Sequence, residues 1–133
     1  MIKLKDLLFK NEAPNIFVPR RIEDRFERMI KTYIRNGSKG NLSLSGLNLT
    51  KLPDILKDIS VDRDFYCYTN NLTSLENCPK YVGGDFWCSY NLLTTLEGAP
   101  KVVGKDFYCG KNPGKFTEEQ VRAVCDVKGK VYR

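Results

Sequence analysis

The sequence contains no histidine, and this absence excludes a large share of familiar enzyme chemistry. Without an imidazole, neither a Ser-His nor a Cys-His nucleophilic pair can form. Long hydrophobic runs are absent as well, since charged residues break up the opening of the chain and no later stretch approaches the length of a membrane span. We therefore expect a cytoplasmic protein that has no signal peptide and no membrane partner.

Cysteine is present, but in a pattern that is typical of neither a disulfide framework nor a metal site. The chain has five cysteines, an odd number, and no two of them form a C-x-x-C pair. We expect these thiols to be reduced and buried, and we expect neither a metal nor another cofactor. The positions are Cys67, Cys78, Cys88, Cys109 and Cys125.

Positive charge is concentrated near the amino terminus. The formal net charge is +6, and residues 1–40 hold ten Lys and Arg against five Asp and Glu. The rest of the chain is close to balanced, with twelve against eleven. Any surface that attracts phosphate is therefore expected in the amino-terminal part.

A 21-residue interval separates three copies of one pattern, F-x-C-x-x-N-x-L-x-x-L. The third copy loses its leucines, because Gly114 and Thr117 stand in their places. A degenerate earlier copy, "NLSLSGLNLTKL", lies 23 residues before the first, which makes about three and a half units. The recurring positions are Asp64, Asp85 and Asp106, then Phe65, Phe86 and Phe107, then Cys67, Cys88 and Cys109, then Asn70, Asn91 and Asn112.

This pattern resembles the leucine-rich repeat L-x-L-x-x-N-x-L, whose units of roughly 20–29 residues each contribute one short strand. The resemblance covers residues 41–116 and implies an α/β solenoid of 21–23-residue units with parallel strands. Two features depart from the family pattern. Val82 and Val103 lie four residues before the phenylalanine instead of three, and Leu47 replaces the repeated asparagine in the first unit.

The exact residues of the repeats narrow the resemblance. "LTSLENCPKYVGGDFWC" and "LTTLEGAPKVVGKDFYC" are similar to leucine-rich repeats in proteins of large tailed bacteriophages, and the opening "MIKLKDLL" agrees with that similarity. The similarity implies a non-enzymatic protein-protein interaction module in the host cytoplasm. Its implied partner is a bacterial host protein, and inhibition of a host defence protein is the implied purpose.

Alternation along each strand assigns the repeated side chains to two faces. Phe65 and Cys67 share the inward face, where a small thiol leaves room for the ring. The repeated asparagines are expected to bond backbone groups of the bend after each strand. The return stretches "NCPKYVGG" and "GAPKVVGK" predict extended or 3₁₀ structure because they combine Pro, Gly and β-branched residues.

Residues 1–40 form the predicted amino-terminal cap, because an uncapped end of the repeats would expose the core. The stretch "PRRIEDRFERMIKTYIRNG" predicts an amphipathic helix that begins after Pro19 and stops at Gly37. The apolar positions of this helix are Ile22, Phe26, Met29, Ile30 and Tyr33.

Residues 117–133 form the predicted carboxy-terminal cap. Thr117 and Gln120 have the spacing of a capping box at the start of a helix. Val121, Val124 and Cys125 form its apolar edge, and "GKVYR" predicts a last strand beside that of Phe107. With the repeats at 41–116 between the two caps, residues 1–133 form a single domain.

The outward face of the strands is the first candidate site. Aromatic side chains beside charge are typical of binding hot spots, because rings desolvate well and lose little rotamer entropy. The resemblance implies the same face, since the concave strand face is the usual ligand surface of leucine-rich repeats. The aromatics would anchor a protein partner, and the aspartates would select a basic surface on it. The predicted partner-binding residues are Tyr66, Trp87, Tyr108, Asp64, Asp85, Asp106, Tyr68 and Tyr90.

The same side chains could instead serve only the sheet itself. Exposed aromatics stabilise sheets by cross-strand packing, and aspartates discourage aggregation along a sheet. A catalytic or divalent-metal role for the aspartates is the weakest alternative, since an open sheet offers no pocket that excludes water. We predict no enzymatic activity and no metal site.

The predicted amino-terminal helix is the second candidate surface. Four arginines on one stripe could track phosphates, which would make the chain a basic nucleic-acid-binding accessory protein. Acidic residues interleave with them, as on an ordinary solvated helix, and docking of a protein is a third alternative. Self-association through an edge strand or a cap is also open. The arginines are Arg21, Arg25, Arg28 and Arg35.

Overall fold

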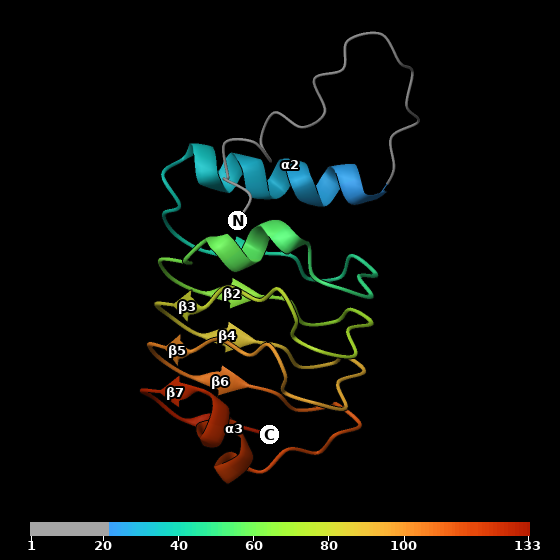
Figure 1. Ribbon diagram of the computed structural model, residues 1–133, viewed down its shortest axis with the longest axis vertical. Coiled ribbons are helices and arrows are strands. Elements are labelled where there is room, and N and C mark those ends of the chain that lie inside the picture. The colour runs from blue at the N-terminus through green and yellow to red at the C-terminus, as the bar shows by residue number, and fades with distance from the viewer. Residues whose placement is uncertain (1–21) are drawn as a thin grey trace, which may run out of the picture.

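The computed structural model describes residues 22–133, with side chains from residue 25 onward, as an α/β structure (Figure 1). Helices α2 (Ile22–Arg35) and α3 (Glu118–Val124) stand at opposite ends of two parallel sheets. A 3₁₀ helix, η1 (Asp54–Asp58), follows the first strand. The predicted α/β class with parallel strands is confirmed, and Arg21 lies outside the described residues. Among the described helices, none has the length and apolar character needed to cross a membrane.

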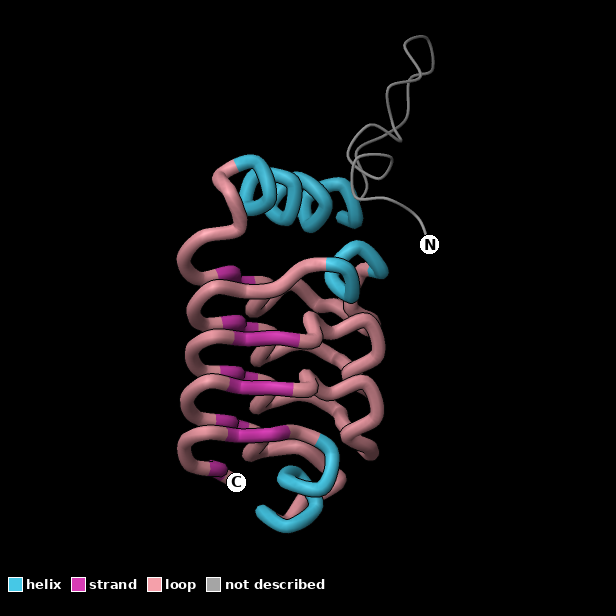
Figure 2. The backbone as a smooth tube through the Cα atoms, turned by 60° about the vertical axis from the view of Figure 1, so that its left-hand side comes forward, coloured by secondary structure: helices cyan, strands magenta, loops and turns pink. Residues whose placement is uncertain are grey.

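The main sheet has five parallel strands, each supplied by one turn of the chain (Figure 2). In spatial order they are β1 (Leu42–Ser43), β2 (Phe65–Tyr66), β4 (Phe86–Trp87), β6 (Phe107–Tyr108) and β8 (Val131–Tyr132). The register pairs Phe65 with Phe86 and Phe86 with Phe107, so the 21-residue interval corresponds to one step across the sheet. The predicted last strand beside Phe107 is confirmed as β8.

A second parallel sheet forms on the return side of the same turns. Its strands are β3 (Tyr81–Val82), β5 (Val102–Val103) and β7 (Asp126–Val127), and Val61 adds an isolated bridge to Val82. The expected extended and 3₁₀ return structure is therefore confirmed. The pairing of these stretches into a sheet was not expected from the sequence.

The core lies between the two sheets and is built from the repeated Phe and Cys side chains. Phe65, Phe86 and Phe107 are fully buried, with ring centroids 6.0 and 4.9 Å apart. All five cysteines are buried and free, as the sequence predicts. In the third unit, Phe116 is buried near the missing leucines, and a Cβ on Gly114 would collide with its ring.

Each repeated asparagine joins two turns of the chain. The Asn91 Oδ1 accepts the backbone N–H of Leu72 at 3.1 Å, and its Nδ2 donates to the carbonyls of Cys67 and Cys88 at 3.0 and 3.1 Å. Asn70 and Asn112 repeat this pattern with their own neighbours. The expected bonds to backbone are confirmed, and the bonds also run to the preceding turn.

Helix α2 covers the first turn with one apolar face. Phe26, Ile30 and Tyr33 are buried, and the Tyr33 hydroxyl donates to the Ser38 carbonyl at 2.9 Å. The expectation for Met29 was wrong, since its side chain is 39% exposed. Met29 lies at the border of the helix face that Phe26, Ile30 and Tyr33 form. A side chain at this border does not point directly at the first turn.

Helix α3 closes the other end. Its predicted capping box is present, because the Gln120 N–H donates to Thr117 Oγ1 and the Thr117 N–H donates to Gln120 Oε1. Val121 and Cys125 are buried, whereas Val124 is exposed and was wrongly expected on the apolar edge. Val124 ends the helix and lies three residues after the buried Val121, at the border of the buried face, and the chain leaves the helix at the buried Cys125.

Replacement of Asn91 by leucine tests the asparagine contacts. Leucine matches the side-chain size but leaves the bonded backbone groups buried without their partner, so we expect Asn91→Leu to lower the free energy of unfolding by about 2–4 kcal/mol. Urea denaturation followed by circular dichroism measures this. The control is Asn71→Leu, because Asn71 is an exposed asparagine next to Asn70 in the preceding turn. This substitution should change the free energy of unfolding by about 0.5 kcal/mol or less. Equal midpoints for the two variants would contradict the assigned role.

Candidate binding surface

A row of four aromatic side chains crosses the outward face of the main sheet. Tyr66, Trp87, Tyr108 and Tyr132 occupy equivalent positions of β2, β4, β6 and β8. Ring centroids lie 3.7 Å apart between Trp87 and Tyr108 and 4.7 Å apart between Tyr108 and Tyr132, with nearly parallel planes. Tyr132 was not among the predicted site residues, although the predicted strand beside Phe107 already contained the signal for it.

Stacking decides which part of each ring a partner could reach. Because the rings of Trp87, Tyr108 and Tyr132 are nearly parallel, their faces cover one another, and the ring edges are left for contact. The Tyr66 ring is tilted by 48° to Trp87 and meets Tyr68 edge to face at 6.0 Å. The cross-strand packing that the sequence allowed as an alternative is therefore present on this face, and it leaves the edges for contact.

The aspartates form a second row, and each one bonds the next turn. Asp64 Oδ1 accepts the Asp85 N–H at 2.7 Å, and Asp85 Oδ1 accepts the Asp106 N–H at 2.9 Å. Asn41 begins the row by accepting the Asp64 N–H, and Asp106 ends it by accepting the Lys130 N–H. This structural role of the recurring Asp was missed, because a sequence pattern does not show which backbone group lies opposite.

Two glycines make room for this row of carboxylates. A Cβ at Gly84 would collide with the Asp64 carboxylate, and a Cβ at Gly129 would collide with that of Asp106. One oxygen of each aspartate is therefore held against the backbone. The second oxygen of Asp64 accepts the Tyr66 hydroxyl at 2.9 Å, which links the two rows.

Two tyrosines on this face, Tyr66 and Tyr108, have a raised pKa. Desolvation raises the pKa of Tyr66 to about 12, with the hydrogen bond to Asp64 and the nearby carboxylates adding to the rise. Desolvation, followed by the charges of Asp85 and Asp106, also raises the pKa of Tyr108. The Tyr66 hydroxyl already donates its proton to Asp64 within the face.

Two further predicted residues lie at the rim of the sheet. Tyr90 is 59% exposed and has a positive φ of 55°, at the sharp bend before Asn91. Tyr68 is 36% exposed and lies 6.0 Å from Trp87. Leu92 is also exposed beside this bend and was missed, since the pattern marks only Leu93 and Leu96 as notable.

The described arginines of the second candidate surface lie on α2, which precedes the strands of the aromatic row in the sequence. Arg25, Arg28 and Arg35 are exposed, whereas Arg21 is outside the described residues. On the same helix, Glu27 and Lys31 form an ion pair at 4.0 Å, as on an ordinary solvated helix. Arg28 lines a hollow, together with residues of β1.

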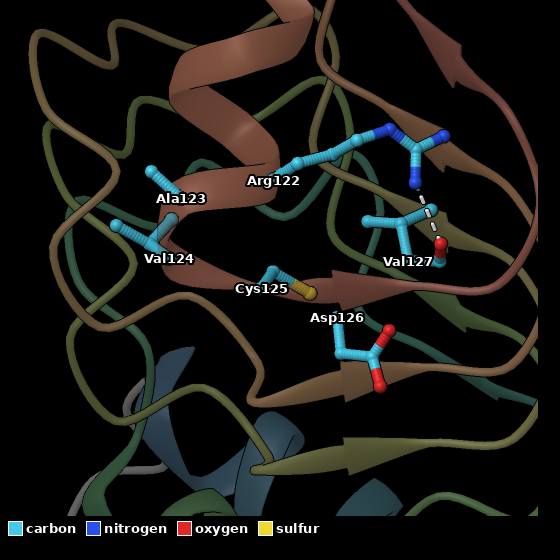
Figure 3. A pocket seen from close by; sticks show the side chains of 6 residues that line it. All are labelled: Arg122, Ala123, Val124, Cys125, Asp126 and Val127. Atoms are coloured by element: carbon cyan, nitrogen blue, oxygen red, sulfur yellow. Dashed lines mark hydrogen bonds between the residues drawn. The ribbon is translucent and has the colours of Figure 1, made fainter.

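A second hollow lies beside the end of α3 and holds about 520 Å³ (Figure 3). Arg122 extends from it, and its Nη1 and Nη2 donate to the Val127 and Gly129 carbonyls, both at 2.7 Å. In the preceding turn the equivalent carbonyls, those of Val103 and Lys105, accept backbone N–H groups instead. The guanidinium therefore takes the place of the two backbone N–H groups that a following turn would supply. We conclude that the residues of this hollow serve to cap the end of the sheets.

Comparisons with known proteins add no assignment. No protein-family model, no curated protein and no solved structure matches this chain. Within residues 22–133, no three or more His, Cys, Asp or Glu side chains are grouped so that they could hold a metal ion. The site must therefore be interpreted from its own geometry.

Substitution of Asp85 separates its two roles. Asn41 already fills the equivalent place with an amide oxygen, so Asp85→Asn should keep the bond to Asp106 and change stability by about 0.5 kcal/mol or less. Asp85→Ala removes the acceptor and should cost about 1–2 kcal/mol. Urea denaturation of both variants checks this. A loss in Asp85→Asn as large as that in Asp85→Ala would mean that charge, rather than the hydrogen bond, matters for folding.

Alkaline pH should destabilise the protein through its thiols. Burial raises the pKa of Cys67, Cys78 and Cys88 well above the usual range, and it raises that of Cys109 and Cys125 to about 11. Thiols of the unfolded chain ionise with a pKa of about 8.5, so only the unfolded state releases protons just above that pH. The contribution of the buried thiols to the free energy of unfolding is therefore complete below about pH 8.5. It is lost progressively as the pH rises from there through the pKa values of the folded state.

Urea denaturation from about pH 8 to about pH 10, under reducing conditions, measures this dependence. The free energy of unfolding should fall steadily across the range. A thiol-specific reagent added at the lower pH should modify the native protein only as fast as it unfolds. A flat stability profile, together with rapid labelling of the native protein, would contradict burial of the thiols.

Proposed function

We propose that the chain is a leucine-rich-repeat-type solenoid that works as a non-enzymatic protein-binding module. The support for the solenoid is the register, which places one strand of each turn beside the equivalent strand of the next in two sheets. The resemblance of the repeats to those of bacteriophage proteins makes a bacterial host protein the proposed partner. Inhibition of that partner is the corresponding purpose.

The binding surface in this proposal is the outward face of the main sheet. The observation that carries it is the pairing of the two rows: each outward aromatic side chain on β2, β4 and β6 follows an aspartate by two residues, and the Tyr66 hydroxyl donates to Asp64. Ring edges carry partial positive charge, and packed aromatics lose little entropy on contact. The rows therefore combine apolar contact area with acceptors that are already held in position.

A basic protein surface fits these rows best. Asp64, Asp85 and Asp106 place three carboxylates on a chain whose net charge is +6, so this face is a local exception to its overall charge. Carboxylates would repel a phosphate backbone, which sets this face apart from a nucleic-acid site. Lys and Arg side chains of a partner could pair with the outer carboxylate oxygens while their stems pack against the ring edges.

Capture from a nuclease-treated bacterial lysate tests this function. The test variant combines Asp85→Asn, Asp106→Asn and Tyr108→Phe, because these changes keep the interturn bonds and the ring stack while they remove charge and a hydroxyl. We expect a specific protein to be retained by the wild type and its affinity for the variant to fall about tenfold or more. Lys101→Gln, an exposed change next to the second sheet, is the matched control.

Two outcomes of the capture experiment decide the proposal. If the partner is lost by the triple variant but kept by the control, the rows are the working surface. If both variants retain the same protein equally, the strand face is not the interface. Circular dichroism of each variant ensures that a loss of capture is not a loss of fold.

A further inference from the structure

A groove runs between α2 and the outer edge of β1, at the end of the main sheet. Its volume is about 500 Å³, and its walls are one face of the helix and the first strand. We propose that this groove binds an acidic segment of a partner protein in extended conformation, added as a further strand beside β1. The lining residues are Arg28, Met29, Thr32, Tyr33, Asn36, Lys39, Asn41, Leu42 and Ser43.

The strand β1 has an open side. Within the described residues it pairs with β2 alone, and the N–H groups of Leu42 and Leu44 donate to the Asp64 and Tyr66 carbonyls at 2.9 and 2.7 Å. Backbone groups alternate in direction along a parallel strand, so those of Ser43 point away from β2 and toward the groove. Such an edge is a template for one more strand.

The charge of the groove selects an acidic occupant. Arg28 and Lys39 are exposed at its margin, and none of the described residues that line it is a carboxylate. Two aspartates of the following turn are close by: Asp62 accepts the Gly40 N–H at 3.1 Å, and the Asp64 N–H donates to Asn41 Oδ1 at 2.9 Å. Glutamate or aspartate side chains of an added strand would meet two cations and the amide groups of Asn36 and Asn41.

The shape of the groove favours a peptide over a small anion. Met29, Tyr33 and Leu42 supply apolar surface beside the polar margin. An extended peptide presents alternate side chains to opposite sides, so one set can contact this apolar surface while the other reaches the cations. This role also accounts for the exposure of Met29, a flexible apolar side chain that adapts well to a partner.

Nuclear magnetic resonance with a defined probe tests the proposal. The probe is a capped peptide of about eight alternating threonine and glutamate residues, titrated into ¹⁵N-labelled protein. The amide signals of Asn41, Ser43 and Lys39 should shift on binding. The same peptide N-methylated at every residue should not bind, because it lacks the N–H donors of both strand edges and so cannot pair with β1. This comparison uses the wild-type protein and does not depend on the folding of a variant.

Charge reversal provides the matched comparison on the protein. Arg28→Glu should weaken binding of the peptide about tenfold or more, whereas Arg35→Glu should weaken it about twofold or less. Arg35 carries the same charge on the same helix and is exposed, but it does not line the groove. Trp87→Ala should leave binding of the peptide unchanged, which keeps this site distinct from the strand face.

Any one of the following results would overturn the proposal: no signal shifts at millimolar peptide, equal binding of the N-methylated peptide, equal losses in the two arginine variants, or stronger binding of a threonine–lysine peptide. Displacement of the acidic peptide by single-stranded oligothymidine, with shifts along α2, would also overturn it and assign the arginines to phosphate binding.

Discussion

The structure depends on one side chain in each of three consecutive turns, the asparagine at Asn70, Asn91 and Asn112. Strands of two residues make too few hydrogen bonds to hold a sheet, and the bends after them carry buried backbone groups that need partners. An asparagine amide supplies a donor and an acceptor at once, and it reaches the preceding turn as well as its own. Leucine offers neither group and aspartate offers no donor, so the repeat retains asparagine.

The residues of the proposed binding surface also contribute to the stability of the strand face. The aromatic rings stack across the sheet, and the aspartates bond the turn that follows, so each row contributes to folding. The groups left for contact are then ring edges and carboxylate oxygens, held by their neighbours. A partner would meet a surface that loses little entropy on binding, which favours tight contact over a modest area.

The sequence predicted those features that follow from alternation and a fixed interval. Phe65 and Cys67 had to share a face, and the interval of 21 residues had to set the register. The second sheet was missed because Val82 and Val103 are equally compatible with an isolated extended stretch. The role of Asp85 was missed because a carboxylate opposite a backbone N–H has the same sequence pattern as a solvated one. Met29 and Val124 lie at the edges of helical faces, where spacing alone does not decide burial.

The hydrogen bonds of Arg122 bear on how a protein of this kind can change in length. Because the guanidinium occupies the place of a following turn, adding residues after the cap would require displacing a charged, forked donor. Duplication of an internal 21-residue segment would meet no such obstacle, since every interior turn already offers the same carbonyls and amides to its neighbours. We therefore expect longer versions of this protein to arise by duplication of internal 21-residue segments, with both terminal caps kept. Each duplicated segment would add one residue to each row of the strand face.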